Sequence, residues 1–568
     1  MTGFGDGHGA AIGAGTVDEP HAAATRIKGA TGRQLSRLRL SGLALVVALG
    51  GVMAIPSSPA APPGLGAAAQ AQTFPAFRQA LAEGVSDNSA LAAFYRETDF
   101  APVWTGAEHE ARRSALVSAL SRAAEHGLPE ARYDLPGLLA AFHAVESERD
   151  RGFAEALASR TFLQFARDIS SGVLEPQAVI SQIVRELPRP DATRLMHDFA
   201  AAEPVSFIRN LAPSSPEYVR LFRAKRDLEA TIARGGWGPR VSGTLRPGQS
   251  GGSVVTLRNR LIAMGYLPRI ATASYDAAMQ QAVQRFQIAH GLEPDGIANQ
   301  ATVAALNVEP QERLRSVIVA LERERWLNIP RGDRHIWVNL ADFTSRIVDN
   351  DHVTFETISI IGQQAGDRQT PEFSDHMTYL EINPDWTIPR SLLGGRWGAI
   401  AAGRYQLIDA RGNIVPASAI DFSRYTPRTL PFNVRQPPGP TNPLGRVKFM
   451  FPNPYAIYLH DTPERGLFRN RVRMFSAGCV RLNDPEDFAY ELLSRQVDDP
   501  VTYYQTILRS GRQTRVFLDD PVPVHLVYRT AFTSVTGELN FRNDAYGRDA
   551  RLYDALRQAG VPMQLAGL

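Results

Sequence analysis

The stretch Phe475-Ser476-Ala477-Gly478-Cys479-Val480-Arg481-Leu482 contains the only cysteine in the 568 residues of the chain. A single cysteine cannot form an intramolecular disulfide, so this thiol does not serve as a covalent staple. Two alternatives remain for Cys479. It is either a small buried apolar side chain or a nucleophile whose thiolate is stabilised by a nearby base or cation. The residues around it favour the nucleophile.

A histidine lies nineteen positions upstream, in Tyr458-Leu459-His460-Asp461. The run from Ala456 to this histidine is apolar and β-prone, which predicts a strand that ends at His460. The small residues before Cys479 predict a tight turn that leads into a second short element at Val480. Two neighbouring elements would bring the imidazole and the thiol together, as nucleophilic catalysis by cysteine requires.

Four further residues are candidates for contacts with a substrate or an oxyanion. Gly478 lets the backbone approach a substrate closely, and the N–H groups of this turn could stabilise a tetrahedral oxyanion. Ser476 belongs to the same turn. Tyr458 shares a strand face with the histidine, so its hydroxyl either reaches the oxyanion or packs into the core. Arg481 either pairs with a substrate carboxylate or bonds to backbone carbonyls.

These segments resemble the active-site signature of the L,D-transpeptidases, the YkuD family. There, a histidine and a spacer precede Ser/Thr-His-Gly-Cys, with Arg or Asn two places on. The runs from Pro437 to Asn453 and from Arg368 to Ser374 resemble the large periplasmic YcbB-type branch. One position departs, since Ala477 stands where the wider family often has histidine. The general base of the family is the upstream histidine, which is present as His460, so the resemblance still implies activity.

The resemblance implies a peptidoglycan L,D-transpeptidase that needs no cofactor and no metal. Cys479 would attack a carbonyl at the third residue of a donor tetrapeptide stem, and the terminal D-alanine would leave. An acceptor amine would then resolve the thioester into a 3→3 cross-link, with His460 moving the protons. The alternatives are an L,D-carboxypeptidase, a transpeptidase that anchors protein to the wall, and a non-catalytic wall-binding scaffold. The expected partners are stem peptides, glycan and other cell-wall synthesis proteins.

The composition is ordinary for a globular protein, with 44% hydrophobic residues, 21% charged residues and a net charge of +3. It gives no reason to expect nucleic acid as a partner. Arg33, Arg37 and Arg39 precede the apolar run from Leu40 to Ile55, and Ala69-Gln70-Ala71 fits a cleavage site. We therefore expect a periplasmic protein with a cleaved signal. The stretch before the apolar run is unusually long for a signal peptide, so an uncleaved inner-membrane anchor is the alternative. The run is slightly short for a spanning helix, which favours cleavage.

Residues 243–308 are predicted to form a compact unit of three helices. Apolar residues at helical spacing make two stripes, Val254, Leu257, Leu261 with Met264, and Met279, Val283 with Phe286. The turn Gly291-Leu292-Glu293-Pro294-Asp295-Gly296 precedes a short third helix. The unit resembles a peptidoglycan-binding domain of the three-helix type. A packing module without a ligand is the alternative.

The expected fold class is a multidomain α+β protein. Apolar periodicity predicts helices before residue 242, the first from Ala80 to Tyr95, and strands after residue 335. The expected parts are a disordered N-terminus with the signal or anchor (1–72), a helical scaffold (73–242), the three-helix unit (243–308), a connecting helix (309–334), a β-rich catalytic domain (335–510) with a capping subdomain around 390–455, and a C-terminal segment that packs on the scaffold (511–568).

Overall fold

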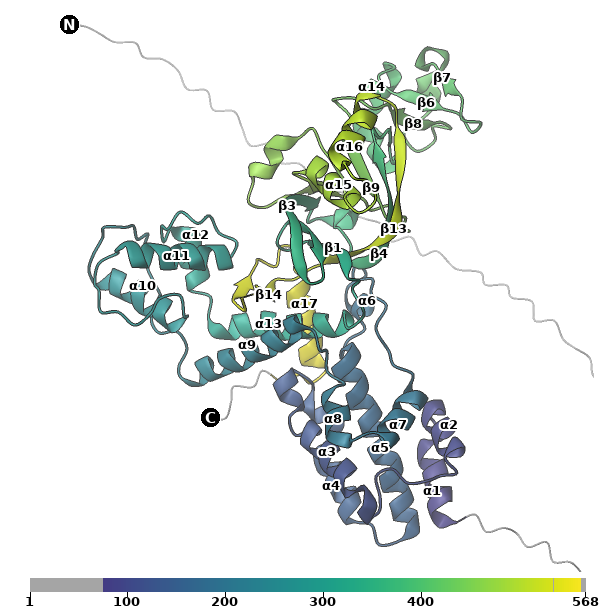
Figure 1. Ribbon diagram of the computed structural model, residues 1–568, viewed down its shortest axis with the longest axis vertical. Coiled ribbons are helices and arrows are strands. Elements are labelled where there is room, and N and C mark those ends of the chain that lie inside the picture. Colours follow the sequence, from purple (N-terminus) through teal and green to yellow (C-terminus); the bar gives the residue numbers. More distant parts are fainter. Residues whose placement is uncertain (1–74, 535, 563–568) are drawn as a thin grey trace, which may run out of the picture. The chain divides into compact units, whose positions relative to one another are not determined.

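The computed structural model describes residues 75–534 and 536–562. The expectations about a signal peptide, its cleavage site and an anchor fall outside the described residues. No helix in the described ranges has the length and apolarity that crossing a bilayer requires. Helical regions are combined with a β-rich domain, so the predicted multidomain α+β class is confirmed (Figure 1).

The N-terminal region is helical, and α5 (Glu148–Ser171) is its longest element. Ser147 begins this helix with a capping box, which satisfies N–H groups that the first turn leaves free. Three large rings pack against one another in the core, those of Trp104, Phe162 and Phe199. The other α-helices of the region are α1 (Ala76–Val85), α2 (Ser89–Glu97), α3 (Glu110–Leu120), α4 (Leu135–His143), α6 (Pro176–Val179), α7 (Ala192–Ala201), α8 (Pro204–Arg209) and α9 (Pro216–Ala233).

The prediction of one helix from Ala80 to Tyr95 is wrong, because this stretch is divided between α1 and α2. The side chain of Asn88 accepts a hydrogen bond from the N–H of Leu91 at 3.1 Å and caps α2. The asparagine side chain accepts a hydrogen bond from a backbone N–H that a continuous helix would use, so a new helix begins here. The apolar periodicity of the sequence continues across this break.

The three-helix module consists of α10 (Gly252–Ala263), α11 (Ala277–Ala289) and α12 (Gln300–Leu306). Apart from half-buried Met264, the predicted apolar stripes are buried in one core. The amide of Gln287 is fully buried and holds the turn before α12, because it donates to Asp295 at 2.7 Å and accepts from the Gly296 N–H at 2.9 Å. The next helix, α13 (Pro310–Trp326), packs on α9.

The β-rich domain contains a nine-stranded sheet in the order β11-β3-β12-β10-β9-β4-β13-β1-β2. An additional pairing of β3 with β2 closes these strands, except β11, into a ring around a large apolar core. The strands are β1 (Arg334–Asn339), β2 (Thr344–Asp349), β3 (His352–Gly362), β4 (Phe373–Ile382), β9 (Val447–Met450), β10 (Leu459–His460), β11 (Met474–Ser476), β12 (Val480–Leu482) and β13 (Thr514–Val527).

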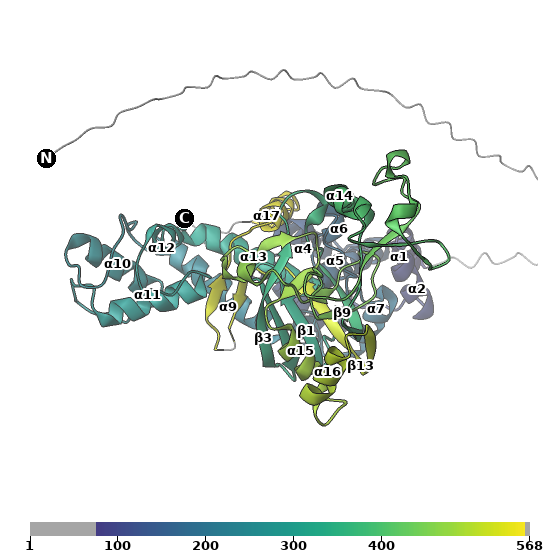
Figure 2. The same ribbon diagram turned by 90° about the horizontal axis from the view of Figure 1, so that it is seen from above.

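Two helices complete this core. The helices α15 (Pro485–Leu493) and α16 (Pro500–Arg509) lie side by side in both views (Figures 1 and 2). Phe488 and Leu492 of α15 and Tyr504 of α16 are buried in the same core as the strands. The Asn-Asp-Pro run before α15 thus positions a helix directly after the strand that follows the cysteine.

The segment between β4 and β9 covers most of the capping subdomain expected around 390–455, and it contains a second sheet in the order β5-β8-β6-β7. This sheet has its own apolar core, which includes Trp386, Ile400 and Leu407. Its elements are β5 (Trp386–Thr387), α14 (Trp397–Ala401), β6 (Gln406–Ile408), β7 (Ile414–Val415) and β8 (Asn433–Gln436). We call this segment the cap.

The C-terminal segment serves two parts of the fold. Its first strand, β13, lies between β4 and β1 in the large sheet, a contribution that the sequence did not indicate. The chain then forms the hairpin β14 (Ala531–Thr533) and β15 (Leu539–Phe541) and the helix α17 (Arg548–Gln558). These pack on α6, α9 and α13, which joins the end of the chain to the helical region.

Candidate active site

Four of the predicted site residues lie on or directly next to two neighbouring strands. β10 and β12 are parallel, with Leu459 opposite Val480 and His460 opposite Arg481. Leu459 and Val480 point into the core, where both are fully buried. Because side chains alternate along a strand, the residues before and after them share the opposite face. These are Tyr458, His460, Cys479 and Arg481.

The turn before the cysteine requires glycine and is held by a serine. Gly478 has a φ of +128°, and a Cβ there would lie 3.1 Å from Ile457 Cδ1. The Ser476 hydroxyl donates to the Cys479 carbonyl at 2.5 Å and accepts from the Gly478 N–H at 3.1 Å. The Gly478 N–H is therefore occupied, whereas the Cys479 N–H has no hydrogen-bond partner among the described residues and is the better oxyanion donor.

A buried threonine connects this turn to the end of the chain. The Thr370 hydroxyl donates to the Gly478 carbonyl at 2.7 Å and accepts from the Gly362 N–H at 2.9 Å. Arg548 of α17 donates to the Thr370 carbonyl at 2.8 Å, and the Tyr546 hydroxyl donates to the Gly362 carbonyl at 2.6 Å. These roles were not predicted from the sequence, although Thr370 lies in the run from Arg368 to Ser374 that resembles the YcbB-type branch.

The surroundings of His460 fix which ring nitrogen carries the proton. It is buried, and its Nδ1 lies 2.5 Å from the Asp461 carbonyl oxygen. A carbonyl only accepts hydrogen bonds, so Nδ1 carries the proton and Nε2 keeps a lone pair. Burial, with smaller contributions from the charges of Arg481 and Lys448, lowers the pKa of His460 to about 3. The imidazole is therefore neutral at neutral pH and free to accept a proton at Nε2.

Cys479 is half-buried, and its thiol donates to the Ala456 carbonyl at 3.6 Å. Burial raises the pKa of the thiol. Hydrogen bonds from the backbone and hydroxyl of Tyr458, and the charges of Lys448 and Arg481, oppose this rise. The thiol and the imidazole, which lie on one face of neighbouring strands, are thus both neutral at neutral pH. The nucleophile would form by proton transfer between them when a substrate excludes water.

Arg481 and Tyr458 were each left with two alternative roles, and the contacts of both side chains bear on the choice. Arg481 makes an ion pair with Glu464 at 2.5 Å, and within the described chain its buried Nε has no partner. Glu464 is 58% exposed, so this pair is weak and a substrate carboxylate could replace it. Tyr458 packs against the cores of both the β-rich domain and the cap, while its hydroxyl reaches the thiol.

A lysine that was not predicted as a site residue lies close to His460 and Tyr458. Lys448 of β9 is directly opposite His460, and Glu381 of β4 is directly opposite Lys448. The Lys448 ammonium lies 3.4 Å from Glu381 and 4.6 Å from the centre of the Tyr458 ring. The chain has only three lysines among 61 basic residues, which is the signal that could have indicated this position.

We predict that Lys448→Met moves the pH dependence of thiol reactivity upwards. The lysine charge lowers the pKa of Cys479, so its loss should raise that pKa and slow reaction with iodoacetamide at a fixed pH near 8. The measurement is the alkylation rate against pH. Arg515→Met is the matched control, because Arg515 contacts Glu381 at 2.8 Å from the other side. A midpoint that does not differ from this control would contradict the role of Lys448.

Family models divide the chain in agreement with this geometry. Residues 333–516 match the YkuD model, described as the L,D-transpeptidase catalytic domain. The chain contains a YkuD domain. Residues 250–306 match the model described as "Putative peptidoglycan binding domain", and residues 89–224 match the model described as "Scaffold domain". The YkuD domain is the one that carries Cys479 and His460, and the three-helix module is the peptidoglycan-binding domain that the sequence predicted.

A curated protein of Haemophilus influenzae, named "Putative L,D-transpeptidase", is 30% identical over 242 residues, which are 41% of this chain and 48% of that protein. The chain thus matches about half the length of this curated relative. Solved L,D-transpeptidases of Xylanimonas cellulosilytica (16% identity, 51% of this chain, 100% of that chain, TM-score 0.16) and Stackebrandtia nassauensis (13%, 51%, 96%, TM-score 0.20) also match. TM-scores this low do not establish a shared fold.

Proposed function

We propose that this chain is a peptidoglycan L,D-transpeptidase that forms 3→3 cross-links through a thioester on Cys479. One observation carries the proposal. The register of β10 and β12 puts a thiol and a neutral, correctly protonated imidazole on one face of a YkuD domain. The peptidoglycan-binding domain supports the wall as the substrate. The place of action would be the periplasm.

Acylation would use the groups in the following way. His460 Nε2 takes the thiol proton, and the sulfur attacks the carbonyl carbon of the third residue of a donor stem. The N–H of Cys479 and the hydroxyl of Tyr458 stabilise the oxyanion. The C–N bond to D-alanine breaks, and the imidazolium returns its proton to the leaving amine. The product of this step is a thioester.

The second half of the reaction reverses these roles. The side-chain amine of an acceptor stem attacks the thioester carbonyl, and His460 accepts a proton from this amine. The C–S bond breaks, the sulfur leaves as a thiolate, and the imidazolium reprotonates it. The new amide bond joins the third residues of two stems. Water in place of the amine would release a tripeptide, which is the activity of an L,D-carboxypeptidase.

Product analysis separates these outcomes. The purified protein is incubated with disaccharide-tetrapeptide, and the muropeptides are separated and identified by mass spectrometry. The proposal predicts 3→3 dimers and free D-alanine with the wild type, and neither with Cys479→Ala. Tripeptide without dimers would contradict cross-linking and would assign water as the acceptor. Absence of any product from a folded wild type would contradict both activities.

A further inference from the structure

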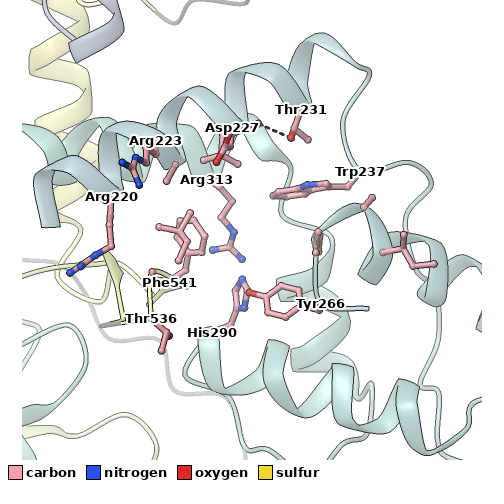
Figure 3. Close-up of a pocket in the computed structure, with 18 residues that line it drawn as sticks. Arg220, Arg223, Asp227, Thr231, Trp237, Tyr266, His290, Arg313, Thr536 and Phe541 are labelled. Carbon is pink, nitrogen blue, oxygen red and sulfur yellow. Dashed lines mark hydrogen bonds between the residues drawn. The ribbon is translucent and has the colours of Figure 1, made fainter. Parts of the chain in front are cut away.

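A cavity of about 620 Å³ lies at the junction of α9, α13, the three-helix module and the C-terminal hairpin. It contains none of the residues of the candidate active site. Figure 3 shows side chains from all these elements directed into one space. Those that decide its chemistry are Arg220, Arg223, Arg313, Trp237, Tyr266 and His290.

Arg313 is the group that most needs a partner. Burial lowers the pKa of its guanidinium to about 10, and its Cζ lies 4.5 Å from the centre of the Phe541 ring. It donates to the Ala305 carbonyl at 3.1 Å, but no carboxylate in the described part of the chain pairs with it. Arg313 is only partly buried and lines the cavity, so its unpaired charge is accessible to a ligand. A bound anion would supply the missing charge.

Two more guanidinium groups line the same cavity. Arg223 is exposed, with no hydrogen bond or ion pair to any described residue. Arg220 donates to the Thr533 hydroxyl at 2.6 Å and lies 3.6 Å from Glu217. The one acidic side chain in the lining, Asp227, is at the exposed edge on α9. Positive charge therefore exceeds negative charge in this cavity.

The rest of the lining is aromatic and uncharged. Trp237 and Tyr266 are part of the wall, as Figure 3 shows. His290 stacks on Phe286 at 3.9 Å, and burial lowers the pKa of its ring to about 3, so it is neutral at neutral pH. Aromatic faces beside arginines suit a ligand that has both apolar faces and carboxylates, as a sugar carrying an acidic peptide does.

A second cavity continues the first toward the catalytic domain. It has a volume of about 650 Å³ and shares Arg220 and His290 with the first. Its lining extends to Arg471 and Arg473, which lead into the strand before the nucleophile turn. Arg471 and Arg473 thus line one end of a groove formed by the two cavities, and the peptidoglycan-binding domain lines the other end.

We propose that the junction cavity is a second binding site for peptidoglycan, in which Arg223 and Arg313 pair with carboxylates of a stem peptide and the aromatic wall contacts its sugar. This inference rests on the proposed function, because the wall supplies the ligand. The site would hold one strand of the substrate so that it runs along the groove toward the YkuD domain. It would raise affinity without touching the reacting atoms.

The test measures binding to the full chain that carries Cys479→Ala, so that no turnover occurs. Disaccharide-tetrapeptide is titrated calorimetrically into this protein and into versions that add Arg223→Gln, Arg313→Gln or both. Arg226→Gln is the matched control, since it is exposed on the same helix and outside the lining. Each of the first two changes should weaken binding about tenfold, the loss of one charge-assisted hydrogen bond. A disaccharide-tetrapeptide with amidated carboxylates should bind weakly to the protein that carries only Cys479→Ala. Its affinity should equal that of the unmodified ligand for the protein that also carries both arginine changes.

Equal affinity of the double variant and the Arg226→Gln control would overturn the second site, as would undetectable binding to the protein with Cys479→Ala alone. Arg223 makes no contact that folding needs, so its result stands even if Arg313→Gln reduces thermal stability. The proposed function is tested separately, by thioester formation on the wild-type protein. If the wild type forms a thioester but the arginine changes leave binding intact, the transpeptidase proposal stands and only the second site is refuted.

Discussion

Replacing His460 with glutamine is expected to slow acylation of Cys479 by roughly a hundredfold to ten-thousandfold, the usual contribution of a positioned general base. Glutamine keeps the polarity of the position but cannot take the thiol proton. The measurement is a single-turnover experiment in which acylated protein is quantified by mass against time. His376→Gln is the control, because His376 is exposed on β4 and its ring makes no hydrogen bond, ion pair or ring stacking with any described residue.

The pH dependence gives an independent check on this assignment. The pKa of His460 is lowered to about 3 and that of the thiol is raised, so both groups keep one protonation state through the neutral range. Wild-type acylation should therefore be level near neutrality. It should fall in acid only as the pH approaches the lowered histidine pKa. A decline centred near the ordinary histidine pKa, or equal rates for His460→Gln and the control, would contradict the role of His460.

The second large effect concerns stability. Glu372 is buried between two guanidinium groups, at 2.5 Å from Arg323 and 2.9 Å from Arg548, and Arg323 also lies 3.2 Å from Asp549. Glu372→Ala would leave both arginines buried with an excess of positive charge. We expect a loss of about 3–5 kcal/mol in the free energy of unfolding, as is typical when one partner of a buried ion pair is removed.

Thermal unfolding followed by circular dichroism measures this loss. Glu125→Ala is the control, since Glu125 pairs with Arg122 at the surface and should contribute less than about 1 kcal/mol. Arg548 also holds the Thr370 carbonyl, so acylation should fall together with stability. An unfolding midpoint for Glu372→Ala that equals the control would show that these charges do not hold α17 on the YkuD domain.

Local pattern was sufficient to predict most elements. The stripes in α10 and α11 and the strands from β1 to β4 follow from apolar periodicity within ten or so residues. The catalytic pairing of Cys479 with His460 follows from the turn signals around two short elements, and it stays a prediction. Where a polar residue competes locally, as Asn88 does, periodicity alone extends a helix too far.

The supporting contacts could not be predicted, because they join distant parts of the chain. Thr370 lies 108 residues before Gly478, and Arg548 lies 178 residues after Thr370. The neighbourhood of Lys448 depends on sheet register rather than on sequence distance. In the strand expected to begin at Ala456, this residue has a φ of +54°, so only Leu459 and His460 pair as β10. The same bend brings its carbonyl to the thiol.

The central claim is that Cys479 carries the acyl group, and intact-protein mass spectrometry tests it most directly. Wild type and Cys479→Ala are each mixed with disaccharide-tetrapeptide, the reactions are quenched in acid, and the intact-protein masses are determined. The account predicts that wild type gains the mass of the donor less D-alanine, that hydroxylamine removes this mass, and that the variant gains nothing. An equal adduct on the variant, or none on a folded wild type that binds the donor, would contradict it.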